Sequence, residues 1–174
     1  MTDLVRIGIH QRVTTKQKTT EIVNDLNNLF KSERLSDVAL VAFKMDDNGN
    51  RMEPRKFHVH KAILGARSEV FCTMFQQKYS KESLENCVEI EDIDADILKE
   101  MLRFIYTGKV YNVEKVADRL LIAAEKYSLN QLKTICEQTL ISLLTIENVA
   151  EIILLAKLYS AQQLLKEATN FLAK

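Results

Sequence analysis

Histidine and cysteine are the side chains of this chain best suited to metal binding or nucleophilic chemistry. His58 and His60 are two positions apart in an apolar run, and on a strand both would point to the same face. Such a pair can hold zinc when a third ligand arrives from elsewhere. The remaining histidine, His10, lies in an N-terminal segment with few core residues. We therefore predict no metal site and no cofactor, with His58 partly exposed and His60 capping a helix that begins at Lys61.

The cysteines are the next candidates, because Cys72 or Cys136 could be a nucleophile if a histidine lay beside it. Each lies in an apolar helical pattern, where a thiol is normally inert. Together with Cys87 they are widely spaced without a CxxC pair, which is typical of reduced thiols in an intracellular protein. No glycine-rich phosphate loop or known catalytic motif is present. The sequence predicts a non-catalytic protein, and an uncharacterised enzyme is the least favoured class.

Asp37 and Lys61 stand at the edges of apolar segments, one before a strand and one at the start of a helix. A charge at the edge of a core usually has a partner, because burying it alone is costly. The two residues could pair, or each could be the solvated end of its own element. The sequence leaves both interpretations open.

Composition excludes several classes of protein. Lys and Arg together number 24, as do Asp and Glu, so the chain lacks the basic surplus that nucleic-acid binding draws on. Apolar residues make up 47% of the 174 residues, enough for a packed core, yet no apolar run is long enough to span a membrane. We expect an intracellular protein of the nucleus or cytoplasm, without nucleic-acid or membrane partners.

The elements that would position these residues change type along the chain. Residues 1–18 are interpreted as an arm or linker, and an amphipathic helix follows over 20–31. Strands are predicted over 38–43, 57–59 and 88–90, with a polar insert over 44–56 that projects into solvent around a turn at 46–50. Short helices are expected over 61–66 and 68–76, and a polar loop over 77–86.

The pattern after Asp92 is helical throughout. One helix should stop at Gly108, and others should cover 113–126, 129–144 and 161–172. A further helix should open at Thr145, an N-cap candidate followed three residues later by Asn148 in place of the usual Glu. Strands early and helices late predict an α+β fold, a small three-stranded sheet covered by helices and followed by a C-terminal helical pair.

The stripe of Ile22, Leu26 and Leu29 on the first helix has two interpretations. It could pack on the core of its own domain, or it could meet a partner helix or a second copy of the chain. Periodicity does not choose between them.

Ordered motifs over about a hundred residues resemble the BTB/POZ family. They are Ser36-Asp37-Val38, the pattern of His60, Lys61, Leu64, Ser68, Phe71, Met74 and Phe75, Val88-x-Ile90, Phe104-Ile105-Tyr106-Thr107-Gly108, and the run from Leu120 to Glu137. Within the family, Lys61-Ala62-Ile63-Leu64, Ala123-Ala124-x-Lys126-Tyr127 and Glu147-Asn148-x-Ala150-Glu151-Ile152 are similar to the speckle-type POZ (MATH-BTB) group. No substrate-binding MATH domain is present in the sequence.

The resemblance implies three parts: an arm or linker over 1–18, a BTB/POZ domain with an N-terminal dimerisation helix over 19–140, and a 3-box-like extension, the start of a BACK region, over 141–174. It implies a homodimeric adaptor that links protein substrates, bound through a domain not in this chain, to a cullin-3 ubiquitin ligase. The dimer interface would contain Ile22, Leu26, Leu29, Ile63, Asp37 and Lys61. Cullin-3 would contact Met74, Phe75, Tyr79, Lys81, Glu82 and Tyr127.

One departure concerns the loop after Phe75, where cullin-binding members carry a hydrophobic-x-Glu motif. Here Tyr79-Ser80-Lys81 keeps the hydrophobic residue but replaces the acid with a base, and Glu82 is the nearest substitute. The alternative function is therefore a BTB dimer that recruits transcriptional corepressors or other partners without a cullin.

Overall fold

The computed structural model describes residues 20–46, 51–76 and 86–173. The predicted arm over 1–18 and most of the predicted turn and loop lie outside these residues. A helix over 20–32 comes first and is called the N-terminal helix. The elements that follow are β1 (Val38–Met45), β2 (Arg51–Val59), α2 (Lys61–Arg67), α3 (Glu69–Gln76), β3 (Cys87–Ile90), α5 (Ala95–Thr107), the 3₁₀ turn η1 (Val113–Lys115), α6 (Ala117–Lys126), α7 (Asn130–Ser142), α8 (Val149–Leu158) and α9 (Gln162–Leu172).

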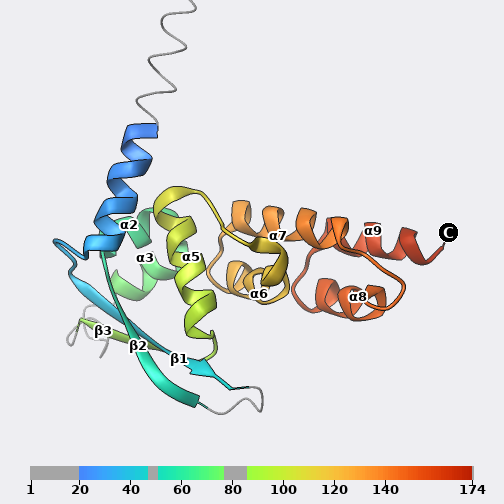
Figure 1. Cartoon of the computed structure of the whole chain (residues 1–174), viewed down its shortest axis with the longest axis horizontal. Coiled ribbons are helices and arrows are strands. Elements are labelled where there is room, and N and C mark those ends of the chain that lie inside the picture. The colour runs from blue at the N-terminus through green and yellow to red at the C-terminus, as the bar shows by residue number, and fades with distance from the viewer. Residues whose placement is uncertain (1–19, 47–50, 77–85, 174) are drawn as a thin grey trace, which may run out of the picture.

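The sheet has the order β2-β1-β3, antiparallel between β1 and β2 and parallel between β1 and β3. The α5 helix lies against the sheet, and the N-terminal helix stands beside α2 (Figure 1). Alternation explains which face is covered, since Val38, Leu40 and Ala42 share one side of β1 and are all buried. The predicted α+β fold with a three-stranded sheet is confirmed.

The two strands of the hairpin are longer than predicted, because residues 44–45 and 51–56 of the predicted insert belong to them. Both strands of the hairpin continue outward, and Met45 of β1 still pairs with Arg51 of β2. Residues 51–56 are all exposed, as predicted for the insert, yet their backbone continues the ladder with β1. A cross-strand contact supports this extension, with the Arg51 guanidinium 4.8 Å from the centre of the Phe43 ring.

The α5 helix contributes much of the core, with one face buried along its whole length. It starts at Asp94, whose side chain accepts a hydrogen bond from Asp96 N at 2.8 Å. It ends at Gly108, where φ is +68° and the backbone N–H donates to Phe104 O at 2.7 Å. The predicted glycine stop is confirmed, because this left-handed conformation suits a residue without Cβ.

The helix predicted over 113–126 is in two parts. Val113–Lys115 forms the 3₁₀ turn, and α6 begins only at Ala117. Val113 and Val116 both pack against the core. Residues three apart align on a 3₁₀ helix rather than on an α-helix, which explains the tighter first turn.

The C-terminal half is a row of helical pairs, α6 with α7 and then α8 with α9, extending away from the sheet (Figure 1). The cap predicted at Thr145 is present one turn before α8. Thr145 N donates to Asn148 Oδ1 at 2.8 Å, and Asn148 N donates to Thr145 Oγ1 at 3.3 Å. Asn148 thus fills the position usually taken by Glu or Gln in a capping box. No helix among the described residues is long and apolar enough to cross a bilayer.

Candidate protein-interaction surfaces

Asp37 and Lys61 lie together where the sheet meets α2. Asp37 Oδ1 accepts a hydrogen bond from the backbone N–H of Lys61 at 2.8 Å, at the first residue of the helix. The Lys61 ammonium instead donates to the side-chain oxygen of Asn86, beside β3. The contact between the two residues is therefore a helix cap made by a distant carboxylate rather than a pair of opposite side-chain charges.

His60 is buried and is the N-cap residue of α2, as predicted, but its side chain makes no capping hydrogen bond. Its Nδ1 lies 2.6 Å from Tyr106 Oη, and its Nε2 lies 2.7 Å from the carbonyl oxygen of Arg34. A carbonyl only accepts, so Nε2 carries the proton, and Tyr106 donates its hydroxyl proton to Nδ1. Tyr106 Oη in turn accepts from His60 N at 3.0 Å, and burial raises the pKa of this phenol to about 12.

The three residues of the predicted stripe on the N-terminal helix, Ile22, Leu26 and Leu29, differ in how far they are buried. Leu26 packs against the core of its own chain, as does Phe30, whose ring centre is 5.0 Å from that of Tyr106. Ile22 is 60% exposed, and Leu29 is half-buried. Ile63 on α2 is also half-buried against the core. Leu26 therefore packs on the core of its own chain, while Ile22 is uncovered and the predicted contact with a partner or second copy stays a prediction.

Leu35 is an interface candidate that sequence analysis missed. It is 86% exposed and has a φ of +62°, the left-handed region that a branched apolar residue seldom adopts. Serine and aspartate follow it, so the sequence shows an ordinary loop. No periodic pattern could have revealed a single exposed leucine in a turn.

Met74 and Phe75 end α3 and remain half-buried beside an aromatic cluster. The ring of Phe71 stacks between Tyr127, at 4.6 Å, and Phe75, at 5.8 Å. Ser68 Oγ secures this cluster by donating to Tyr127 O at 2.7 Å. Tyr127 itself is only 1% exposed, and burial raises the pKa of its phenol. The structure thus places Tyr127 in the core beneath the expected cullin surface, whereas Tyr79, Lys81 and Glu82 lie outside the described residues.

A hollow of about 330 Å³ adjoins Met74 and lies between α3, the end of β3 and the C-terminal end of α6 at Tyr127. Its walls combine apolar side chains with charged ones, and Asp92 forms an ion pair with Lys126 across it. The hollow could receive an apolar side chain of a protein partner, next to a polar rim.

The candidates for chemistry are distributed without an assembled centre. Burial raises the pKa of the Cys136 thiol to about 12, so it stays protonated and unreactive at neutral pH. Cys72 and Cys87 are half-buried free thiols. Within the described residues no group of three or more His, Cys, Asp or Glu side chains could hold a metal ion.

Comparison with known proteins agrees with this picture. The model of the BTB/POZ domain family matches residues 26–144. Among solved structures, the BTB domain of zebrafish PATZ1 superimposes with a TM-score of 0.54 at 25% sequence identity, covering 72% of this chain and 92% of that chain. BTB domains are generally non-catalytic modules that dimerise and bind protein partners. The order of elements, the three-stranded sheet and the family match together show that this chain belongs to the BTB/POZ domain family.

Proposed function

We propose that this protein is a homodimeric adaptor that links protein substrates to a cullin-3 ubiquitin ligase in the nucleus or the cytoplasm. The observation that carries the proposal is the pair of uncovered apolar side chains around the N-terminal helix, Ile22 at 60% and Leu35 at 86% exposure. Exposed apolar surface of this kind is typical of an interface with a second copy. A dimer would present two cullin arms to one substrate and so raise the effective concentration of the ligase.

The half-buried Met74 and Phe75 support the part of the proposal that concerns cullin binding. They close α3 beside the 330 Å³ hollow, where a partner side chain could be received without unfolding the domain. The α8–α9 pair extends the molecule beyond residue 144, where the family match ends. In this proposal that pair is the 3-box-like extension of the cullin surface, and Tyr127 supports the surface from beneath.

The test is a calorimetric titration of the chain with the N-terminal part of a cullin-3. We expect a dissociation constant of about 1 μM or lower, equivalent to about 8 kcal/mol. The Lys81→Glu variant should bind more tightly, because it restores the acidic group of the family motif. If neither the unmodified chain nor the Lys81→Glu variant gave heat or co-eluted with the cullin, the adaptor function would be refuted.

A second function is favoured by Lys81 itself, which replaces the acid expected at that position. In that case the chain is a BTB dimer that recruits corepressors or other proteins without a cullin. A dimeric mass by light scattering, combined with no cullin binding by either protein, would favour this alternative.

The dimer is tested separately by Ile22→Asp combined with Leu35→Asn. Asparagine tolerates a left-handed backbone better than leucine, so this pair should give a folded monomer. Leu26→Asp and Leu29→Asp, at two other positions of the predicted stripe, should also give monomers, but Leu26→Asp additionally damages the core. Leu158→Asp on α8 is the control, since it changes an equally exposed leucine far from the helix. An unchanged dimeric mass would show that these residues do not form the interface.

A further inference from the structure

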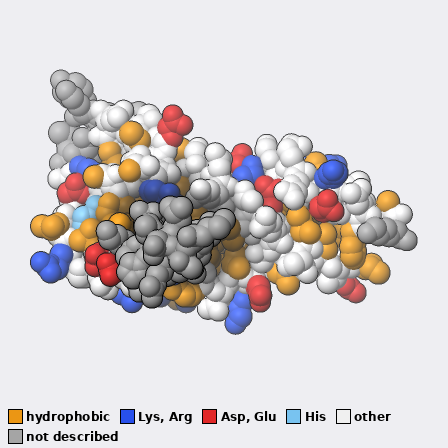
Figure 2. All heavy atoms as spheres, turned by 90° about the horizontal axis from the view of Figure 1, so that it is seen from above, with side chains coloured by type: hydrophobic (Ala, Val, Ile, Leu, Met, Phe, Trp, Pro, Cys, Tyr) orange, Lys and Arg blue, Asp and Glu red, His pale blue; other side chains and the backbone are white. Residues whose placement is uncertain are grey.

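Basic side chains surround a cavity of about 390 Å³ between the N-terminal helix, β2 and α5. Lys31 comes from the N-terminal helix, Lys56 and His58 from β2, and Lys99 and Arg103 from α5. Among the residues that the structure describes, Glu33 is the one acidic residue that lines the cavity. The chain as a whole has equal numbers of acidic and basic residues. Charges of both signs are also interspersed on the face shown in Figure 2, so this local excess of positive charge is unusual for the molecule.

The positive charge of the cavity is largely uncompensated. Lys31, Lys56 and Lys99 form no ion pair with any residue that the structure describes. Arg103 is already engaged, because its Nη1 lies 2.7 Å and 3.1 Å from the two carboxylate oxygens of Glu100. Three lysines from three separate elements therefore remain available for an anion.

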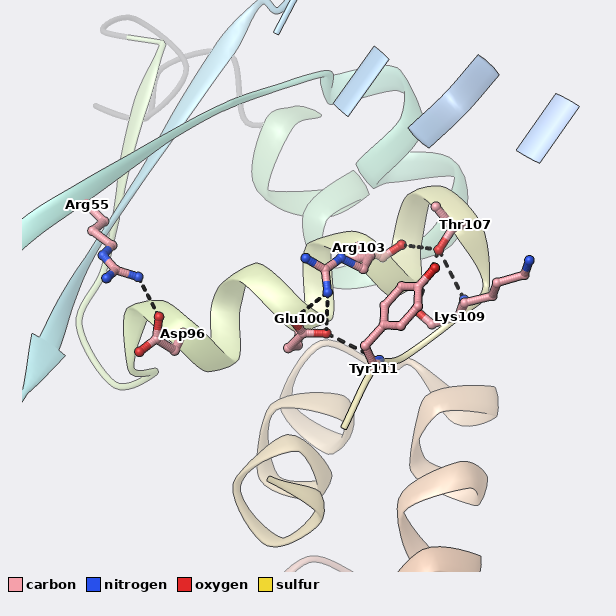
Figure 3. A network of polar contacts seen from close by, with 7 residues as sticks. All are labelled: Arg55, Asp96, Glu100, Arg103, Thr107, Lys109 and Tyr111. Atoms are coloured by element: carbon pink, nitrogen blue, oxygen red, sulfur yellow. Dashed lines mark hydrogen bonds and ion pairs between the residues drawn. The ribbon is translucent and has the colours of Figure 1, made fainter. Parts of the chain in front are cut away.

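The walls are held in place by contacts along α5. Arg55 of β2 forms an ion pair with Asp96 in the first turn of the helix, and Arg103 lies over the Tyr111 ring, with its guanidinium 5.0 Å from the ring centre (Figure 3). Arg55 precedes Lys56 on β2, so this exposed ion pair connects the β2 backbone beside Lys56 to α5. These contacts join the backbone elements that carry the lysines, and ordered walls lower the entropic cost of binding.

Two aromatic side chains give the cavity an apolar floor. Phe30 and Phe57 both line it and both pack against the core. A volume of 390 Å³ lies in the range of ordinary ligand pockets, and an apolar floor with a few charged groups is their usual composition. The ligand should therefore combine an anionic group with an adjacent apolar one.

Protection of a sheet edge is the alternative explanation for such lysines. Lys56 and Pro54 lie on β2, an outer strand of the sheet, where both residue types discourage strand addition. This reason covers Lys56 but not Lys31 or Lys99, which come from helices. Their convergence with His58 and Arg103 on one cavity requires a different explanation.

Ile22 of the proposed dimer face lies away from the cavity, whereas Leu35 is only two residues from Glu33, which lines it. Ile22 and Lys31 are nine residues apart on the N-terminal helix, which is about two and a half turns. They consequently lie on opposite sides of that helix, so a second copy seated on Ile22 leaves the cavity open. The expected cullin residues Met74 and Phe75 line neither this cavity nor its rim.

We propose that this cavity binds an acidic segment of a partner protein, with a phosphate or paired carboxylates held by Lys31, Lys56 and Lys99 and an adjacent apolar side chain on Phe30 and Phe57. The charge arrangement matches recognition of phosphorylated or acidic motifs by clustered cations. A peptide is favoured over nucleic acid because the positive charge is confined to one cavity in a chain of zero net charge.

The experiment is fluorescence anisotropy with the full chain and three peptides that have the same sequence, including one leucine, except at the anionic positions. One carries phosphoserine, the second two glutamates, and the third neutral serine. The first two should bind with micromolar affinity that weakens as salt rises, and the neutral peptide should bind at least about tenfold more weakly. Stronger binding of the phosphopeptide would identify phosphate as the source of the anion, and equal binding would identify carboxylates.

Variants locate the binding. The double variant Lys56→Glu/Lys99→Glu should lower affinity by about tenfold or more, because both exposed lysines reverse their charge. The matched control is Lys115→Glu/Lys166→Glu, which makes the same change in charge on η1 and α9. Glu33→Gln should act in the opposite direction and strengthen binding. Circular dichroism confirms that each variant is folded.

Several results would overturn the proposal. These are equal binding of the neutral peptide, an equal loss in the control variant, or no binding of either acidic peptide at millimolar concentration. Inorganic phosphate or adenosine monophosphate that bound as tightly as the phosphopeptide would identify a small-anion site instead. A single-stranded oligonucleotide that bound more tightly than both acidic peptides would identify a nucleic-acid surface.

Discussion

Helices α2 and α9 lie at opposite ends of the molecule, and each receives its N-terminal cap from a carboxylate far away in sequence. At α2, Asp37 accepts from Lys61 N at 2.8 Å; at α9, Glu137 of α7 accepts from Leu164 N at 3.0 Å. The two hydrogen bonds differ in their surroundings. Asp37 is exposed, whereas Glu137 is buried at 9% exposure.

Burial makes these two similar bonds unequal. Water can replace Asp37 at the end of α2, so little is lost without it. A buried amide deprived of Glu137 has no such substitute and keeps its full desolvation cost. Glu137 also connects α9 to α7, and nearby Lys133 Nζ donates to Ser160 O at 3.1 Å, just before α9. The docking of the α8–α9 pair thus depends on α7, while α2 has a second support in His60 and Tyr106.

Glu137→Ala should have the largest effect on stability. It leaves the Leu164 N–H buried without an acceptor, at a cost of about 2–3 kcal/mol. Denaturant unfolding measures the loss, and hydrogen exchange should show it concentrated in α8 and α9. Glu137→Gln keeps an acceptor and should lose less. Equal losses in both variants would mean that the charge, and not the buried hydrogen bond, matters.

Tyr106→Phe should rank next and test the second support of α2. It removes the hydroxyl that bonds both His60 Nδ1 and His60 N, at a cost of about 1–2 kcal/mol. The matched control is Tyr111→Phe, since Tyr111 is exposed. A loss as small as that of the control would show that water replaces this hydroxyl as readily as it replaces Asp37.

The same variant should change the alkaline pH dependence. The pKa of Tyr106 is raised from 10.0 to about 12 in the folded chain, so the unfolded chain loses its proton first as pH rises. Stability from this group is complete below pH 10 and declines up to about pH 12. Tyr106→Phe should show a shallower decline over this interval by chemical denaturation. An unchanged slope would contradict the burial of a neutral phenol.

Asp37→Ala should cost only about 1 kcal/mol, as for other exposed caps. Asp25→Ala on the N-terminal helix provides a control for the loss of one exposed negative charge. The double variant Asp37→Ala/Glu137→Ala should show additive losses, since the two sites share no partner. If Asp37→Ala proved as costly as Glu137→Ala, burial would not explain the difference between the two caps.

Thr145→Val should have the smallest effect, about 0.5–1 kcal/mol. It removes the hydroxyl that accepts from Asn148 N in an exposed, local capping box before α8. Thermal unfolding would report this as a small fall in melting temperature. A loss comparable to that of Glu137→Ala would show that the local box, rather than the distant carboxylate, holds the C-terminal pair.

Local patterns alone predicted most of the elements. Features that depend on interactions within a few residues can be predicted from the sequence. They include the alternation over 38–43, the glycine stop at Gly108 and the Thr145–Asn148 capping box. Element boundaries failed where tertiary packing overrides local preference. Pairing with β1 extended β2 through polar residues, and packing of Val113 and Val116 on the core separated η1 from α6.

The candidate sites also divide into features that local motifs predict and contacts that depend on tertiary packing. Sequence motifs identified the BTB/POZ family, and they singled out Asp37 and Lys61, which the structure brings into contact. They could not show that Asp37 caps a helix or that His60 bonds Tyr106, since these contacts join residues 24 and 46 positions apart.

The sequence by itself determined the fold class and the family, because periodicity and ordered motifs are properties of short segments. Only the tertiary structure decided which apolar residues are uncovered, which carboxylate caps which helix, and that Lys31, Lys56 and Lys99 surround one cavity. Those features arise where separate elements pack together, and no local spacing records which surfaces will meet.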